Sequence, residues 1–297
     1  MADLVELLAA VDERPPTEAG AYVIDGEDAV LGSVLVETSR VCWAQAPGRR
    51  ARLRELLRGH AERALDDTEL DDAFARCRDE RRPLGDILAE RALVSDHGLR
   101  AAIKQHTVES LIAQCRGASE RVTWVPHRRC GYHPRFTFPP TELLAAAGAE
   151  LYPAEAAGAE YALEPVLHGT RAAGSFAIGD DDAAVAVYVS ISIPLALRDV
   201  LWLGDWAAAA LAACNGFSPG VMARAIADTG GRAVLGWRSA RRLVHMAVFD
   251  DPQRLTAAVA QLALRGIPAV LTSRVPAIRG QGTASQPTPT HATVEGA

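Results

Sequence analysis

A ten-residue stretch, Ala184–Ile193, constrains the fold more than any other part of the chain, because its side chains alternate strictly in character. The branched residues at every second position are Val185, Val187, Val189, Ile191 and Ile193. Successive side chains of a β-strand point to opposite faces of a sheet, so this period of two predicts a strand with one face in a core. The apolar run at Gly174–Ile178 precedes it across the aspartates Asp180–Asp182, and the two runs together predict a hairpin.

The segments that follow this hairpin predict a sheet with helices packed against it. A helix is expected from about Arg198 to Cys214, because Asn215-Gly216 favours the left-handed conformation that ends helices. A short helix should follow, and Asp251-Pro252 offers an N-cap and a first-turn proline for a later helix. The remaining expected elements are a hairpin of strands at 233–237 and 243–249, that helix through residue 265, and a last strand at 267–275.

The N-terminal half predicts a second, smaller sheet with several helices. Leucine and valine at helical spacing favour a helix from Asp3 to Val11, and Thr38-Ser39 separates two strand-like runs as a hairpin turn would. The expected strands are 21–24, 29–37, 40–44 and 122–125, and the expected helices are 50–60, 68–78, 84–91, 95–115 and 141–147.

These patterns predict an α+β protein of two modules. Residues 1–153 should form a small sheet with a helical layer, and residues 159–276 a profilin-like antiparallel sheet flanked by helices. The small-residue stretch Ala154–Gly158 is the expected linker between them. Residues 277–297 are rich in Gly, Thr, Ser, Pro and Gln, a composition that favours a disordered tail.

Composition excludes several classes of function. The net charge of −6 argues against a binder of nucleic-acid backbones, so no nucleic-acid partner is expected. Lys104 is the single lysine, and Ile103 precedes it, so the chain has no GxxxxGK[ST] phosphate loop. Five scattered cysteines favour reduced thiols, and no apolar run reaches the ~18–20 residues of a membrane span. We therefore expect a cytoplasmic protein with no membrane partner.

The strongest candidate for a functional surface is the helix Val200–Cys214, which is apolar nearly all round. A helix on a sheet needs only one apolar face, so a second surface must cover the other one. That surface is either the rest of this protein or a partner, for which the two tryptophans would be anchors. The residues proposed for this interface are Trp202, Leu203, Trp206, Ala209, Ala210 and Ala213.

The chain carries no recognisable catalytic signature: it has no GxSxG elbow and no GxGxxG after a strand. We therefore expect a protein that is not an enzyme and has no cofactor. The alternative is an enzyme or a small-ligand sensor, with a site between the modules near His127, Cys130, His133 and His168. The spacing of the first three is H-x₂-C-x₂-H, but a structural zinc site needs four ligands, so a polar loop is the favoured interpretation and no metal is expected.

The first module resembles the PATAN-type signalling domain of bacteria, a relative of the N-terminal domains of type II secretion ATPases. The motifs that carry this resemblance are Ala19–Ile24, Gly32–Val36, Arg40–Ala44, Leu84–Leu88, Leu93–Ser95, Leu99 and Ala102-Ile103. Some of these relatives bind cyclic di-GMP through an arginine, a glycine and a glutamine. This chain has Pro83, Ala92 and His106 at those positions, so we expect no nucleotide there.

The second module resembles the roadblock/dynein-light-chain domain in its order of elements. Its matching segments are Leu163, Val166–Gly169, Ala172–Asp181, the alternating strand, the helix after it, and the final hairpin and helix. The resemblance implies dimerisation through the central helix and an adjacent strand, and a small Ras-like GTPase as a partner. The expected function is thus a bacterial signalling or scaffold protein, a homo-oligomer that works by protein–protein interaction.

Overall fold

The computed structural model describes residues 2–27, 29–61, 63–91, 93–116, 121–167, 170–179, 184–192, 195–215, 224–228, 232–240, 242–265 and 271–274. Its helices are α1 (Ala2–Asp12), α2 (Arg50–Gly59), α3 (Asp67–Glu80), α4 (Leu84–Glu90), α5 (Asp96–Arg116), α6 (Pro140–Leu151), α7 (Pro153–Leu167), α8 (Leu197–Asn215) and α9 (Pro252–Leu264), with a short 3₁₀ turn at Pro134–Phe136. Its strands are β1 (Ala19–Asp25), β2 (Val30–Glu37), β3 (Arg40–Gln45), β4 (Arg121–Pro126), β5 (Ala172–Ile178), β6 (Ala184–Ile191), β7 (Arg224–Asp228), β8 (Ala233–Ala240), β9 (Leu243–Phe249) and β10 (Leu271–Arg274). The predicted α+β class is confirmed.

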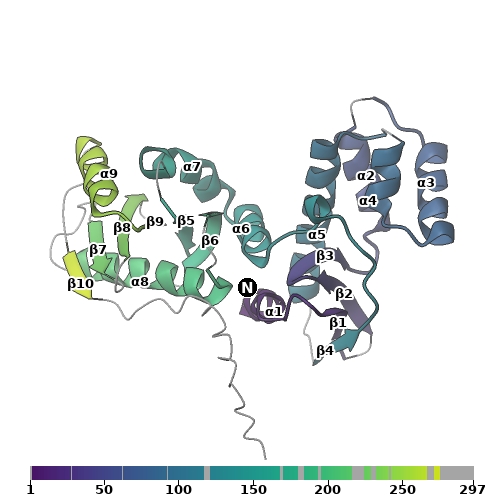
Figure 1. Cartoon of the computed structure of the whole chain (residues 1–297), viewed down its shortest axis with the longest axis horizontal. Coiled ribbons are helices and arrows are strands. Elements are labelled where there is room, and N and C mark those ends of the chain that lie inside the picture. Colours follow the sequence, from purple (N-terminus) through teal and green to yellow (C-terminus); the bar gives the residue numbers. More distant parts are fainter. Residues whose placement is uncertain are drawn as a thin grey trace, which may run out of the picture.

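The first sheet is antiparallel with the strand order β3-β2-β1-β4 (Figure 1). The predicted turn at Thr38-Ser39 is confirmed, since Glu37 pairs with Arg40 and both turn residues have positive φ, at 54° and 57°. Such a two-residue turn matches the right-handed twist of the strands it joins. Helix α5 packs on this sheet, α2 and α4 pack beside α5, and α3 packs beside α4, so that the four helices form a layer (Figure 1). The Asp66 and Glu69 side chains close a capping box at the start of α3.

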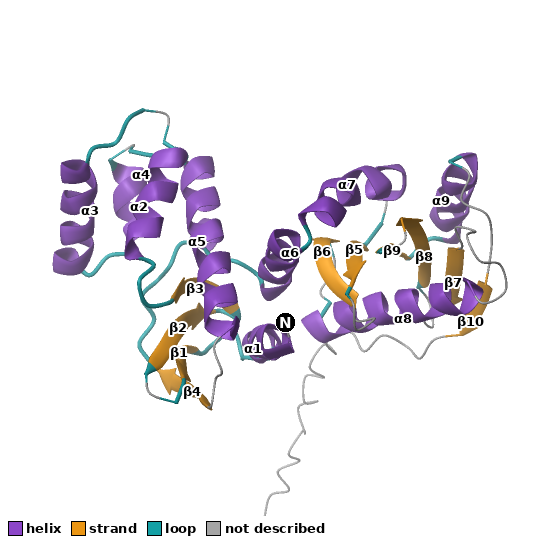
Figure 2. Cartoon of the chain, turned by 180° about the vertical axis from the view of Figure 1, so that it is seen from behind, coloured by secondary structure: helices purple, strands orange, loops and turns teal. Residues whose placement is uncertain are grey.

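The second sheet has the strand order β10-β7-β8-β9-β5-β6 and is antiparallel except that β10 runs parallel to β7. Helices lie on both faces of this sheet, α8 on one and α7 and α9 on the other (Figure 2), and alternate residues of β9 belong to different apolar clusters. Val244, Met246 and Val248 belong to the apolar cluster that contains α8. Ala247 and Phe249 belong to the cluster of α7 and α9 on the other face.

One expectation for this half of the chain was wrong. The expected linker, Ala154–Gly158, lies inside helix α7, because alanine is the best helix former and the single glycine there is tolerated. The described residues of the segment after α8, Arg224–Asp228, form strand β7, which pairs with β8 and was not expected; the rest of that segment, where a short helix was expected, lies outside the described residues. The turn residues Asp180–Asp182 and the expected tail, 277–297, lie outside the described residues.

Helices α1 and α6 lie between the two sheets (Figure 1). Leu4, Leu8 and Val11 of α1 share one apolar cluster with Leu143 of α6 and Val200 of α8, so the two modules have a continuous core. Helix α6 also packs against β6 so closely that a Cβ atom on Gly148 would lie 1.9 Å from the carbonyl oxygen of Ala186. Because β6 is an edge strand, α6 covers its free side.

The end of α1 caps the start of α8. The Oδ2 atom of Asp12 accepts a hydrogen bond from the backbone N–H of Leu197 at 2.7 Å, and burial raises the pKa of that carboxyl group. We expect Asp12→Ala to lower the free energy of unfolding by about 1 kcal/mol, because a helix N-terminus loses its acceptor. Asp12→Asn keeps an acceptor oxygen and should lose less. Urea unfolding of both variants measures the difference, and equal losses would contradict a capping role.

No helix within the described part of the chain is long and apolar enough to cross a membrane.

Candidate functional site

The buried side of α8 fixes the helix on the second sheet. Leu203, Ala207 and Leu211 are fully buried at helical spacing. A Cβ atom on Gly204 would lie 2.5 Å from the ring of Phe176, so the absence of a side chain there lets the helix lie directly on β5. The predicted helix is therefore confirmed, and one of its two apolar sides is covered by the chain's own sheet.

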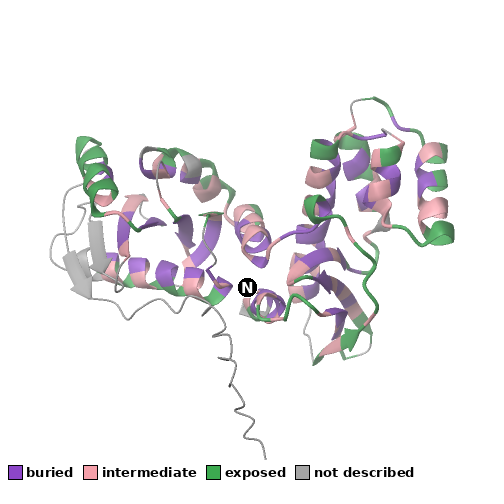
Figure 3. Cartoon of the chain, viewed as in Figure 1, coloured by how far each residue is buried: buried purple, intermediate pink, exposed green. Residues whose placement is uncertain are grey.

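The opposite side of α8 is exposed along its length. Figure 3 shows buried and exposed residues on opposite sides of this helix. Trp202 keeps 38% of its surface exposed. Asp205, Ala209 and Ala212 are exposed at the following positions of the same stripe, three or four residues apart. Apart from Asp205, this stripe offers a partner a large aromatic ring followed by small side chains.

The six residues predicted for the interface separate into different environments. Leu203 is fully buried in the core, so the prediction was wrong for this residue: its side chain already contacts the sheet. Trp206 and Ala210 are half-buried and pack on the same core, and the Trp206 ring lies over Gly236 of β8. Trp202 and Ala209 are exposed. The side chain of Ala213 lies outside the described ones.

Among the described residues, the contacts of α1 with α8 lie at the start of α8. Arg198 forms ion pairs with Glu13 at 2.6 Å and with Glu6 at 3.4 Å, both from α1. Together with the Asp12 cap, these contacts hold the first turn of α8 against α1. Trp202 and Ala209 lie beyond that turn, so intramolecular contact at the N-terminal end of the helix leaves them exposed.

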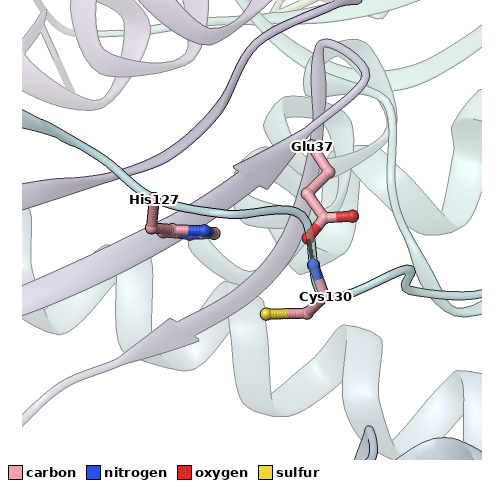
Figure 4. A group of neighbouring side chains, drawn as sticks. All are labelled: Glu37, His127 and Cys130. Atoms are coloured by element: carbon pink, nitrogen blue, oxygen red, sulfur yellow. Dashed lines mark hydrogen bonds between the residues drawn. The ribbon is translucent and has the colours of Figure 1, made fainter.

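The residues of the alternative site converge in part. His127 and Cys130 lie close to Glu37, with one ligand atom of each within 4.8 Å of the others (Figure 4). His133 lies elsewhere: its Nδ1 accepts from the backbone N–H of Arg135 at 3.3 Å and caps the 3₁₀ turn. His168 lies outside the described residues. Sequence spacing could not reveal Glu37, because it lies about ninety residues before the other two.

A cavity of about 350 Å³ lies inside the first module, between β3 and the helical layer. Trp43 and His106 stack in its wall, with ring centroids 4.7 Å apart. This cavity belongs to the first module, whereas the predicted small-ligand site was expected between the two modules. Of the four residues predicted for that site, Cys130 lines the cavity. The other lining residues are Leu35, Gln45, Arg49, Leu53, Phe74, Cys77, Arg81, Arg82, Pro83, Leu84 and Tyr132.

The second sheet contains a serine–histidine–serine chain that the sequence did not reveal. The Nδ1 atom of His245 lies 2.7 Å from the Ser175 hydroxyl, and its Nε2 atom lies 2.6 Å from the Ser239 hydroxyl. His245 and Ser175 are fully buried, and burial lowers the pKa of His245 to about 3. His245 and Ser175 are thus enclosed in the core, whereas Ser239 is half-buried.

No family model, no curated protein and no solved structure matches this chain.

Proposed function

We propose that the protein is a non-catalytic cytoplasmic signalling or scaffold protein, and that the exposed face of α8 binds the same face of a second copy. The observation that carries this proposal is the exposure of Trp202 on a helix whose opposite side is fully covered. Trp202 keeps more than a third of its surface in water, and tryptophan is the residue type most enriched at the energetic centres of interfaces.

The stripe on α8 is suited to a two-fold contact. In such a contact both copies use the same patch. If one residue of the first copy contacts a second residue of the other copy, the reverse contact also forms. Antiparallel pairing of two α8 helices places each Trp202 over the small residues Ala209 and Ala212 of the other copy. All three are exposed, so the large side chain of one helix fills the space left by small ones on its partner.

The covered edge of the sheet at β6 favours a helix contact over a strand contact there. Helix α6 lies along the free side of β6, with Gly148 against the Ala186 carbonyl. A second copy therefore cannot extend the sheet at β6. The resemblance to roadblock domains implies dimerisation through the central helix, here α8, and a small Ras-like GTPase as a further partner.

The test is the oligomeric state of Trp202→Glu. We expect the full chain to dimerise and the variant to weaken the dimer by ~30-fold or more, since a loss of about 2 kcal/mol at a central aromatic residue corresponds to that factor. Light scattering coupled to size-exclusion chromatography over a range of concentrations measures both, and thermal unfolding confirms that the variant is folded.

Leu264→Glu is the matched control. Leu264 is an apolar residue of α9, 80% exposed, on the opposite face of the same sheet, so its replacement should leave the dimer unchanged. A wild-type chain that is monomeric at every concentration would contradict self-association. Equal effects of the two substitutions would contradict the assignment to α8.

A further inference from the structure

Three neighbouring strands bring Glu37 and His127 to the same place. Ala19 of β1 pairs with Glu37 at the end of β2, and its carbonyl oxygen accepts the backbone N–H of His127 just beyond β4 at 3.0 Å. Residues directly opposite each other in antiparallel strands project to the same face. The small side chain of Ala19 therefore leaves room above β1 for a carboxylate from one side and an imidazole from the other.

The imidazole of His127 is held in one tautomer. Its Nδ1 atom lies 2.8 Å from the carbonyl oxygen of Arg128, and a carbonyl can only accept, so Nδ1 carries the proton. The lone pair is then on Nε2, which is buried and has no hydrogen-bond partner among the described residues. A backbone carbonyl on one ring nitrogen and a free lone pair on the other is the arrangement found for metal-binding histidines.

The carboxylate and the thiol complete the group. Glu37 is only 5% exposed, and its two oxygens accept the backbone N–H groups of Cys130 at 2.6 Å and Gly131 at 3.3 Å. These bonds hold the carboxylate in place and bring the turn that carries Cys130 toward it. In Figure 4 the Cys130 sulfur and the His127 ring point toward each other, with the carboxylate beside them.

We propose that Glu37, His127 and Cys130 bind a divalent transition-metal ion, and that zinc is the ion whose chemistry fits best. Zinc accepts imidazole nitrogen, thiolate sulfur and carboxylate oxygen, and three protein ligands leave a fourth position for water or an incoming ligand. On binding, the Cys130 S–H bond breaks, its proton goes to the buffer, and the sulfur lone pair binds the ion.

The geometry needs only local closure. Zinc bonds of about 2.0–2.3 Å place the donors of a tetrahedral site about 3.3–3.8 Å apart, and here the three atoms lie within 4.8 Å of one another. Cys130 is exposed, and Gly131 beside it has a φ of 74° in an open part of the loop. Rotation of the Cys130 side chain and a small shift of this loop bring the sulfur to bonding distance.

The test uses the full chain, stripped with a chelator and titrated with Co²⁺ and then with Zn²⁺. We expect one cobalt ion per chain, with a thiolate-to-cobalt absorption band in the near ultraviolet that Zn²⁺ abolishes by displacement. Cys130→Ser should remove this band, and His127→Ala should weaken cobalt binding ~100-fold. Glu37→Gln should weaken it at least ~10-fold, on the scale that disturbed metal sites show.

His133→Ala and Cys77→Ser are the controls, because both residues lie outside the group: His133 follows Cys130 in the chain, and Cys77 lines the same cavity as Cys130. Both should keep the band and the affinity. Because Cys130 is exposed, its replacement by serine leaves the core intact, and circular dichroism verifies this. A stripped wild type that gives no band would overturn the proposal. So would a band that survives in Cys130→Ser or disappears in either control.

Discussion

Replacing Gly148 by alanine lowers the free energy of unfolding by about 1–3 kcal/mol, the usual range for overpacking a tight contact. The new Cβ atom would lie 1.9 Å from the Ala186 carbonyl oxygen, which is backbone of β6 and cannot rotate away. Helix α6 must therefore move off the strand, and the backbone entropy that alanine saves is too small to compensate. Urea unfolding followed by circular dichroism measures the loss.

Gly158→Ala is the matched comparison and should have the opposite sign. Gly158 is also inside a helix, α7, but the nearest side-chain atom to its added Cβ lies 3.7 Å away, an ordinary contact. Alanine should therefore stabilise the chain by about 0.5–1 kcal/mol, the difference in helix propensity. If the two substitutions changed stability in the same direction, the close packing of α6 on β6 would be refuted.

Acidification destabilises the wild-type chain through His245. Burial lowers the pKa of His245 to about 3, and the unfolded histidine titrates near its ordinary value of 6.5. The unfolded chain therefore binds a proton that the folded chain does not. The free energy of unfolding is highest above pH 6.5 and falls as the pH decreases toward 3. Each pH unit in that window costs about 1.4 kcal/mol, or ~2 kcal/mol between pH 6.5 and pH 5.

The comparison of wild type with His245→Gln isolates this effect. The variant carries no titrating group at that position, so its stability should fall less steeply from pH 6.5 to pH 5. Some slope remains, because burial also lowers the pKa of His106. His97→Gln removes an exposed histidine and should keep the wild-type slope, since His245 is intact. Parallel curves for wild type and His245→Gln in denaturant titrations would show that His245 is not the group responsible.

Most of the fold could be predicted from local patterns. The alternation at Ala184–Ile193 predicted β6, and Asp251-Pro252 predicted the start of α9. The Asp251 carboxylate accepts a hydrogen bond from the backbone N–H of Gln253 there, at 2.8 Å. The start of helix α7 was missed because Ala154–Gly158 contains only small side chains and one glutamate, which look like a linker, although the buried Ala159, Leu163 and Val166 that follow are at helical spacing. Strand β7 was missed because a strand of only five residues has little periodicity of its own.

The candidate sites were predicted less completely, for a physical reason. An apolar helix can be recognised from its sequence, but which side meets the sheet depends on partners such as Phe176, which the helix sequence does not contain. Trp202 and Trp206 are equivalent as sequence features, and only packing separates the exposed ring from the one over Gly236. The group of Glu37, His127 and Cys130 could not be predicted from sequence spacing, because only the pairing of strands brings Glu37 close to the other two residues.

The contact between α1 and α8 has a consequence for synthesis on the ribosome. Asp12 and Leu197 are 185 residues apart in the chain, and at about 5–20 residues per second the second emerges roughly 10–40 s after the first. During that interval the side of α1 that will meet α8 has no partner from the second module. The nascent first module therefore presents an apolar surface that α8 later covers, and such transiently exposed surfaces are prone to aggregate.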